Sequence, residues 1–397
     1  MITILADKNI PFLSDYLPDT FQLHFFDPDT SFTQWIDDSN RVNVQGLLIR
    51  TVSNISVNNP DLTYFPNLKF IGTASAGIDH VDTDHLTKNG IHFSSAAGCN
   101  ANAVGEYVTT AVLHWCLSNK LDISSLQIGI IGIGKTGSSV YHHLNGLGCS
   151  CILYDPPRSI REKEFKSATL KELMKCDVLT FHVPLTKESQ TDYPTFKWLK
   201  GDKLEEFNGK LIINASRGEV VEESALMNWK SIDSDKNEFI IDVWESEPNI
   251  NVEFAMNSWI ATPHIAGYSN QSKRNATRLI VEELAHYFNL PMSDSNKAEN
   301  DTEVSKQEHF AMTLEAIDNT VPNEITILEH LHPMFCLSQD MKSGLSESSV
   351  TNINLFRSLR THSKLRDEYK TLSANQIQSF QHFPQIYKLL MISKGSM

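Results

Sequence analysis

The feature that most constrains this chain is a glycine-rich turn that follows an apolar run. Residues 126–137 read LQIGIIGIGKTG, in which the isoleucines predict a buried strand that ends directly in Gly132-x-Gly134-x-x-Gly137. A helix-like segment follows, and a second apolar run then stops at Asp155. This order of strand, glycine turn, helix and second strand is typical of a dinucleotide-binding unit.

Each glycine of the turn has a physical task in such a unit. Gly132 permits the tight turn, Gly134 lets a pyrophosphate approach the backbone, and Gly137 allows the helix to pack closely on the strand. The first N–H groups of the helix attract the phosphates. The alternative is a glycine-rich turn without a ligand, and the acid that ends the second strand favours the nucleotide site.

Asp155 also bears on which cofactor binds. A carboxylate at this place accepts hydrogen bonds from the adenosine ribose and repels a 2′-phosphate, so we predict NAD rather than NADP. Arg158 is the one residue nearby that could accommodate such a phosphate.

The composition excludes several classes of protein. The 397 residues carry a formal net charge of −14 without a cluster of basic residues, which argues against a nucleic-acid surface. The six cysteines form no disulfide framework, and Cys149-x-Cys151 has the wrong spacing for a zinc pair, so we predict reduced thiols and no metal. Without a signal peptide or an apolar run of membrane-spanning length, the expected location is the cytoplasm.

Alternating strands and helices predict an α/β protein with two doubly wound, Rossmann-like parallel sheets. Ligands gather at the carboxyl ends of such strands, which draws attention to Arg50, Thr51, Ser75 and Gly77 in the first hundred residues. The predicted strands are 2–6, 44–49, 68–73, 126–131, 151–154, 178–182, 210–214 and 238–242, with longer helices at 100–117 and 277–290. A linker is expected at 291–307, and the tail shows a possible strand at 325–328 and a helix at 356–369.

Three strand ends in the second sheet supply chemical groups. They are Arg217, the carboxylates within 242–247, and His264 in a Pro/Gly-flanked loop. An arginine can bind a substrate carboxylate through two hydrogen bonds, and a histidine can take a hydroxyl proton while hydride leaves the adjacent carbon. An acid can hold the imidazole tautomer. These are the ingredients for oxidising a 2-hydroxy acid.

Each of these residues has an alternative role. Arg217 could form a surface ion pair, and His264 could be a structural histidine, with His182 as its competitor. Spacing alone does not choose between Glu245 and Glu247 for the acid, and the neighbouring Asp242 could contact the nicotinamide amide.

The motifs together resemble the D-isomer-specific 2-hydroxyacid dehydrogenase family. The resemblance rests on the glycine turn and on three segments, NASRG at 214–218, DVWESEP at 242–248 and TPHIAG at 262–267. It implies the catalytic set Arg217, Glu247 and His264. It also implies a substrate-binding domain at 1–95 completed by 268–290, an NAD-binding domain at 96–267, and an abbreviated α+β dimerisation region at 291–397, hence a homodimer.

Further motifs, including ASAGIDHVD at 74–82 and AGCNA at 97–101, resemble a branch of the family that oxidises a phosphorylated four-carbon 2-hydroxy acid. This narrower resemblance implies Thr51, Ser75 and Tyr268 at the substrate. For the substrate phosphate we add Arg50, although an ion pair with a neighbouring acid is equally open. The alternatives are a dehydrogenase for phosphoglycerate, glyoxylate or lactate, and a non-catalytic NAD-sensing protein. The implied NAD contacts are Gly132, Gly134, Gly137, Asp155, Val183, Ala215, Ser216, Arg217, Asp242 and Gly267.

Overall fold

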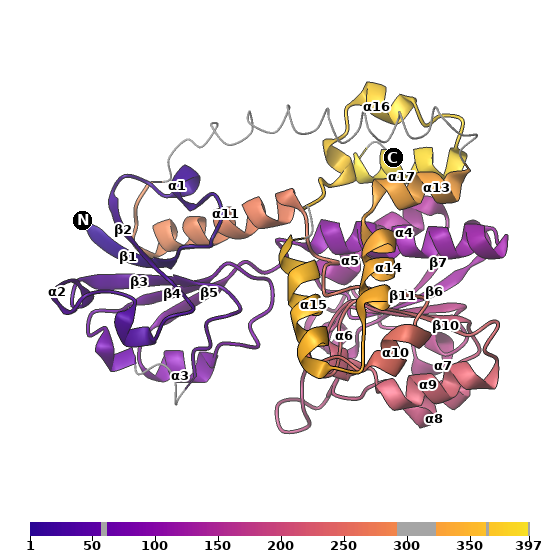
Figure 1. Cartoon of the computed structure of the whole chain (residues 1–397), viewed down its shortest axis with the longest axis horizontal. Coiled ribbons are helices and arrows are strands. Elements are labelled where there is room, and N and C mark those ends of the chain that lie inside the picture. The colour runs from indigo at the N-terminus through magenta and orange to yellow at the C-terminus, as the bar shows by residue number, and fades with distance from the viewer. Residues whose placement is uncertain (57–61, 292–322, 363–364, 396–397) are drawn as a thin grey trace. The chain divides into compact units, whose positions relative to one another are not determined.

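The computed structural model describes residues 1–56, 62–291, 323–362 and 365–395 (Figure 1). The described residues form two compact units, one from Met1–Asn100 and Asn270–Ser305, the other from Ala101–Ser269 and Lys306–Met397. The chain therefore leaves the first unit after Asn100 and returns to it at Asn270. Each unit is built on a parallel sheet, which confirms the predicted fold class.

The sheet of the first unit has the strand order β2-β1-β3-β4-β5, and all pairings are parallel. The order reverses at β1, so the crevice of this sheet opens where β1 and β3 end. The elements of this unit are β1 Ile2–Asp7, α1 Leu13–Tyr16, β2 Phe21–Phe26, η1 Phe32–Gln34, α2 Asp38–Arg41, β3 Val44–Ile49, η2 Leu62–Tyr64, β4 Phe70–Thr73, α3 Thr83–Lys88, β5 His92–Ser95 and α11 Asn270–Tyr287.

Two strands of this sheet, β2 and β5, were not predicted from the sequence. Both are edge strands, and an edge strand lacks the continuous apolar run that a strand buried on both faces needs. The returning helix α11 also starts earlier than predicted, at Asn270. Its buried residues Ile280 and Leu284 pack with Ile4 and Phe70 of the sheet.

The sheet of the second unit has the parallel order β11-β10-β9-β8-β6-β7, and its order reverses at β6. A ligand is therefore expected at the carboxyl ends of β6 and β8, where the glycine turn begins. The elements are α4 Ala101–Asn119, η3 Ile123–Ser125, β6 Gln127–Ile131, α5 Lys135–Leu147, β7 Ser150–Tyr154, α6 Pro156–Arg161, α7 Leu170–Leu173, β8 Val178–Phe181, α8 Gly201–Glu206, β9 Leu211–Asn214, η4 Gly218–Val220, α9 Glu223–Ile232, β10 Glu238–Ile241, α10 Val252–Asn257 and β11 Ile260–Ala261.

The described part of the tail is helical and packs within the second unit. The strand expected at 325–328 is wrong, because these residues lie in helix α13. Asn323 caps that helix by accepting the Thr326 N–H at 3.0 Å. Most of the expected linker, 292–307, lies outside the described residues. The elements are α13 Glu324–Leu331, α14 Met334–Gly344, α15 Ser349–His362, η6 Tyr369–Thr371, α16 Ala374–Gln378 and α17 Pro384–Ser393.

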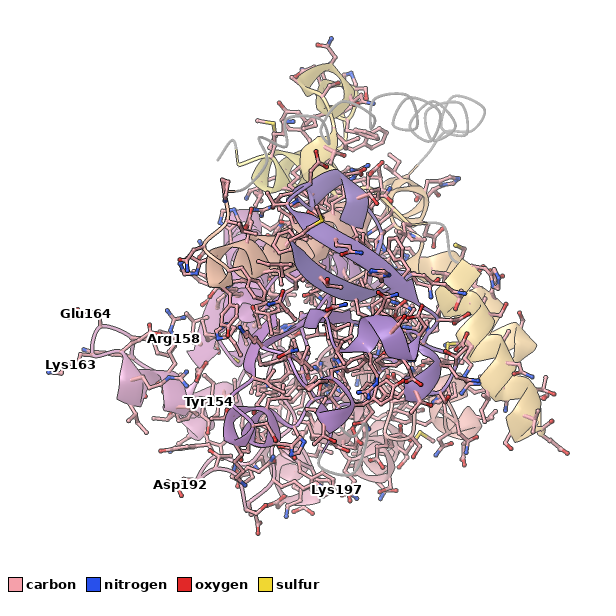
Figure 2. The ribbon with its side chains drawn as sticks, turned by 90° about the vertical axis from the view of Figure 1, so that its left-hand side faces the viewer. Tyr154, Arg158, Lys163, Glu164, Asp192 and Lys197 are labelled. Carbon is pink, nitrogen blue, oxygen red and sulfur yellow. The ribbon has the colours of Figure 1, made fainter. Side chains whose placement is uncertain are left out.

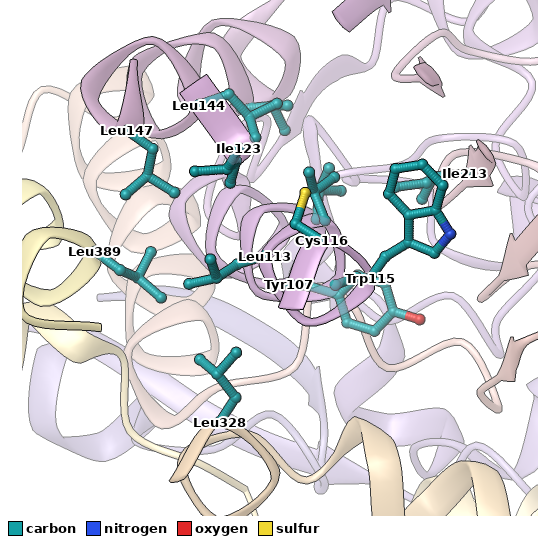
Figure 3. Close-up of a cluster of buried hydrophobic side chains, with 14 of the residues drawn as sticks. Tyr107, Leu113, Trp115, Cys116, Ile123, Leu144, Leu147, Ile213, Leu328 and Leu389 are labelled. Carbon is teal, nitrogen blue, oxygen red and sulfur yellow. The ribbon is translucent and has the colours of Figure 1, made fainter. Parts of the chain in front are cut away.

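Helix α4 is the centre of the largest apolar cluster of the second unit (Figure 3). Its side chains, among them Leu113 and Cys116, contact α5 through Leu144 and the tail through Leu328 and Leu389. Burial on all sides accounts for the nearly continuous apolar character of α4 in the sequence. The tail is thus part of the core of the second unit.

Among the helices that the structure describes, none has the length and hydrophobicity to cross a bilayer. All six cysteines lie in the described residues and carry free thiols.

Candidate active site

The glycine turn has the geometry of a cofactor cradle. Gly132 has a φ of 86°, and a Cβ there would lie 2.6 Å from the His182 carbonyl oxygen. A Cβ on Gly137 would lie 1.9 Å from the Gly132 carbonyl oxygen, so helix α5 could not approach the turn. A Cβ on Gly134 would meet nothing within 4 Å. The open space at Gly134, directly before α5, therefore fits the pyrophosphate of NAD.

Asp155 joins the end of β7 to this turn. Its carboxylate accepts the Ile133 N–H at 2.8 Å and the Arg158 N–H at 2.9 Å. Arg158, which is labelled in Figure 2, lies in helix α6 just after Asp155. Its guanidinium donates to the Ile133 carbonyl oxygen at 2.7 Å and to Glu162 at 2.8 Å, and lies over the Phe165 ring. Because these groups already engage the arginine, its position favours NAD over a cofactor with a 2′-phosphate.

Three other predicted cofactor contacts lie at neighbouring strand ends. Val183 follows β8, and a Cβ on Gly132 would lie 2.6 Å from its Cγ1 atom, so its side chain lies against the glycine turn. Ser216 follows β9 and donates from its hydroxyl to Asn214 at 2.9 Å. Ala215 lies between Asn214 and Ser216, at the start of the same turn.

Asn214 also fixes the backbone that carries Arg217. Its amide donates to the Arg217 carbonyl oxygen at 2.9 Å, and the Arg217 guanidinium donates to the Ser216 carbonyl oxygen at 2.7 Å. The next residue, Gly218, packs tightly against the following strand end, because a Cβ there would lie 2.0 Å from the Trp244 carbonyl group. The arginine turn and the acidic segment 242–247 are therefore in backbone contact.

Glu247 and His264 are joined by a direct hydrogen bond. The His264 Nδ1 atom lies 2.8 Å from a Glu247 carboxylate oxygen. Glu245, the competing acid, instead accepts the Glu223 N–H at 3.0 Å. The structure thus brings together the Glu247 and His264 pair that the resemblance implies.

Asp242 holds the histidine loop. Its buried carboxylate accepts the Thr262 hydroxyl at 2.6 Å, the Ile265 N–H at 2.7 Å and the Ala266 N–H at 2.9 Å. His264 itself has a φ of 58°, a left-handed conformation that costs energy in a residue with a side chain. The Asp242 bonds on both sides keep it there. This role was not foreseen from the sequence.

Burial and neighbouring charges act on these acids in opposite directions. Burial raises the pKa of Asp242. Burial also works to raise the pKa of Glu247, but the positive charge and hydrogen bond of His264, the Trp244 N–H and the charge of Arg360 outweigh it, so the pKa of Glu247 is lowered. Glu247 is therefore the carboxylate suited to hold a charged imidazole.

His182 lies in a different environment from His264. Its Nε2 atom lies 2.9 Å from the Thr180 hydroxyl, and burial lowers the pKa of the ring to about 3. Such an imidazole stays neutral at physiological pH, so it is poorly suited to proton transfer. The geometry favours His264 as the acid–base group.

The predicted substrate contacts of the first unit lie at the ends of β3 and β4. The Arg50 guanidinium donates to the fully buried Asp7 at 2.8 Å, which is the ion pair considered from the sequence. Thr51 is exposed just beyond it. The Ser75 hydroxyl donates to the Gly77 carbonyl oxygen and lies 2.8 Å from the Thr73 hydroxyl.

The tail supplies contacts that sequence reasoning missed. The Ser269 hydroxyl donates to the Glu368 carboxylate at 2.7 Å, and Asn102 donates to the other oxygen of Glu368 at 2.8 Å. Arg360 lies over the ring of Tyr268, with its guanidinium carbon 5.3 Å from the ring centroid. Gly267 connects this segment to the histidine loop.

A parallel sheet with a glycine turn, an acid that ends the second strand and a paired acid and histidine defines a nicotinamide-dependent dehydrogenase. The sequence model described as "D-isomer specific 2-hydroxyacid dehydrogenase, NAD binding domain" matches residues 110–266. The chain belongs to the D-isomer-specific 2-hydroxyacid dehydrogenase family. NAD is its cofactor.

The similar proteins give a narrower picture. The chain is 36% identical over 333 residues to the erythronate-4-phosphate dehydrogenase of Marinomonas sp. (strain MWYL1), covering 82% of this chain and 83% of that protein. It is 34% identical over 373 residues to the enzyme of the same name from Coxiella burnetii (strain RSA 331 / Henzerling II), covering 94% of each.

A solved structure shows the same fold. An NADPH-dependent glyoxylate/hydroxypyruvate reductase from Sinorhizobium meliloti superposes with a TM-score of 0.59 at 22% identity. The match covers 74% of this chain and 98% of that one. About a quarter of this chain therefore lies outside the shared fold.

Proposed function

We propose that the protein is an erythronate-4-phosphate dehydrogenase, which oxidises 4-phospho-D-erythronate to 2-oxo-3-hydroxy-4-phosphobutanoate in pyridoxal 5′-phosphate (vitamin B6) biosynthesis. The observation that carries the reaction type is the 2.8 Å contact between Glu247 and His264 in the unit that holds the glycine turn. The similarity to enzymes of that name supports the substrate.

Each catalytic residue has a separate task in the proposal. Bound NAD supplies the hydride acceptor. Arg217 binds the substrate carboxylate and polarises the reacting oxygen. Because Nδ1 of His264 is bonded to Glu247, Nε2 is the atom that takes the hydroxyl proton. Glu247 fixes this tautomer and stabilises the imidazolium that results.

The remaining predicted contacts complete the proposal. Thr51, Ser75 and Tyr268 bind the substrate, and Arg50, which is paired with Asp7, is the residue predicted from the sequence for its phosphate. The NAD contacts are those of the glycine turn together with Asp155, Val183, Ala215, Ser216, Arg217, Asp242 and Gly267.

We also propose a homodimer in the cytoplasm. The family resemblance supports the dimer, and six free thiols suit a reducing compartment. Sedimentation equilibrium of the purified chain tests the dimer, because a monomeric mass across the accessible concentrations contradicts it.

The decisive experiment follows NAD reduction with 4-phospho-D-erythronate, unphosphorylated D-erythronate and 3-phosphoglycerate in parallel, with and without a 2-oxo acid acceptor. Arg217→Ala and His264→Ala are the controls. Reduction specific to the phosphorylated four-carbon acid, lost in both variants, supports the proposal. If NAD is reduced only with another acid, that acid replaces 4-phospho-D-erythronate as the proposed substrate. If NAD binds but no acid reduces it, the result favours the NAD-sensing alternative.

A further inference from the structure

The proposed substrate carries a carboxylate and a phosphate, so its site needs two positive partners. Arg217 suits the carboxylate. Arg50 was predicted for the phosphate, but its guanidinium is already bonded to the buried carboxylate of Asp7 at 2.8 Å. A buried acid offsets much of the positive charge that a phosphate would meet.

A second candidate for the phosphate comes from the tail. Arg360 lies in the last turn of helix α15, and its guanidinium covers the Tyr268 ring at 5.3 Å. Tyr268 is four residues beyond His264 and is itself a predicted substrate contact. The charge of Arg360 also reaches Glu247, whose pKa it helps to lower. Arg360 is thus near both the proton-transfer pair and the predicted substrate tyrosine.

The position of Arg360 is fixed on both sides along the chain. One turn before it, Phe356 is buried in the core of the second unit. After it, Arg366 donates to the fully buried Glu106 of helix α4 at 2.5 Å and to the Ala103 carbonyl oxygen at 3.0 Å. Helix α15 therefore cannot move away from the core of the second unit without exposing Phe356.

The loop that Arg360 covers is held by the same segment of the tail. Glu368, which is 1% exposed, accepts the Ser269 hydroxyl at 2.7 Å, directly after Tyr268. Two consecutive residues of the loop thus contact the tail. An arginine fixed beside a substrate loop matches the requirement for a pre-arranged anion partner.

We propose that Arg360 is a specificity residue of the active site, which recognises the phosphate of the substrate and distinguishes phosphorylated from unphosphorylated 2-hydroxy acids. This inference rests on the proposed function, in which a phosphorylated acid is the substrate. It assigns to the tail a part in substrate recognition besides any part in dimerisation.

The test measures binding as well as turnover. Quenching of NADH fluorescence in the enzyme complex reports the binding of 4-phospho-D-erythronate and of D-erythronate. We expect Arg360→Ala to weaken binding of the phosphorylated acid by about tenfold or more and that of D-erythronate by less than about twofold. Arg360→Lys should restore part of the affinity, because lysine keeps the charge but not the planar fork.

Arg357→Ala is the matched control, because Arg357 is exposed one turn earlier on the same helix. It removes the same charge and should bind both acids like the unchanged protein. Equal weakening of both acids by Arg360→Ala overturns the proposal, because the residue would then only support the loop. Unchanged binding of both acids also overturns it.

Failure of the proposed function gives a different result. If the unchanged protein oxidises no 4-phospho-D-erythronate, the proposed function fails, and the comparison is repeated with 3-phosphoglycerate and glycerate. A selective loss of the phosphorylated acid in Arg360→Ala then still supports the role of Arg360. If Arg360→Ala weakens binding of 3-phosphoglycerate and glycerate equally, or weakens neither, the proposed role of Arg360 is overturned.

Discussion

The Nδ1 atom of His264 lies 2.8 Å from the carboxylate of Glu247, although the two residues come from the ends of different strand-loop segments. Asp242 determines this geometry, because its carboxylate accepts two backbone N–H groups and a hydroxyl from the histidine loop. The acid that orients the imidazole and the acid that orients the loop are therefore separate residues.

Replacing His264 should remove the chemistry and leave cofactor binding intact. We expect His264→Asn to lower kcat by about 10²–10⁴, the usual contribution of a general acid–base group, with an unchanged Kd for NAD. His182→Asn is the comparison, because the low pKa of His182 leaves it no part in proton transfer. Steady-state kinetics check this, and an equal loss of kcat in His182→Asn would contradict the assignment.

The two glutamates of the acidic segment should behave differently. Glu247→Gln keeps the size of the side chain but cannot stabilise an imidazolium, so we expect kcat to fall by roughly 10- to 100-fold. Glu245→Gln should retain most of the activity, because the Glu245 side chain accepts the Glu223 N–H and does not contact the imidazole. If Glu245→Gln lowers kcat more than Glu247→Gln does, Glu245 and not Glu247 would be the acid that supports His264.

Two glycines of the turn should separate binding from folding. Gly134→Ala places a methyl group in open space, so we expect normal thermal stability and a large loss of NAD affinity. Gly137→Ala forces a methyl group into the Gly132 carbonyl oxygen and should cost about 1–3 kcal/mol of stability. Thermal melting and calorimetric NAD titration measure both. Unchanged NAD binding in Gly134→Ala would contradict the assignment of the pyrophosphate to the open space at Gly134.

Stability should depend on pH through Glu223. Burial raises the pKa of its carboxyl from 4.5 to about 7, the Glu245 N–H opposes this, and the Glu245 charge adds to it. Between pH 4.5 and about 7, the unfolded chain has released the Glu223 proton that the folded chain keeps. The free energy of unfolding therefore falls as pH rises through this range. The loss is complete above about pH 7 and amounts to about 3 kcal/mol at most.

Urea unfolding at about pH 5 and about pH 8 tests this dependence, with Glu223→Gln as the variant. The glutamine keeps the oxygen that accepts the Glu245 N–H and does not titrate. We expect a smaller difference between the two pH values in the variant, and an equal difference would exclude Glu223 as the source.

The sequence was sufficient for features that depend on local pattern. The central strands of both sheets are apolar and buried on both faces, and three glycines at this spacing directly after an apolar strand are typical of dinucleotide binding. The edge strands β2 and β5 were missed because neither is a continuous apolar run: β2 (FQLHFF) alternates apolar and polar residues, and β5 (HFSS) is mostly polar. Residues 325–328 are rich in β-branched side chains, yet the Asn323 cap and burial against α4 make them helical.

In the candidate site, too, the residues in local sequence motifs were predicted and the contacts that depend on tertiary packing were not. Arg217, Glu247 and His264 stand in recognisable segments at strand ends, and the resemblance chose between the two glutamates. Glu368 contacts Ser269 and Asn102, which are 99 and 266 residues away along the chain, and Arg360 contacts Tyr268, which is similarly distant from it. Local periodicity contains no information on such pairs, because they depend on how the tail packs.

Glu368 has an evolutionary consequence. Its carboxylate accepts one hydrogen bond from Asn102, just after the chain enters the second unit, and another from Ser269, just before the chain leaves it. A substitution at any one of the three positions would remove at least one hydrogen bond of the Glu368 carboxylate, which is 1% exposed. Among homologues these three positions should therefore vary together, and in a lineage that lost the tail Asn102 would keep only its hydrogen bond to Glu106 of the same helix.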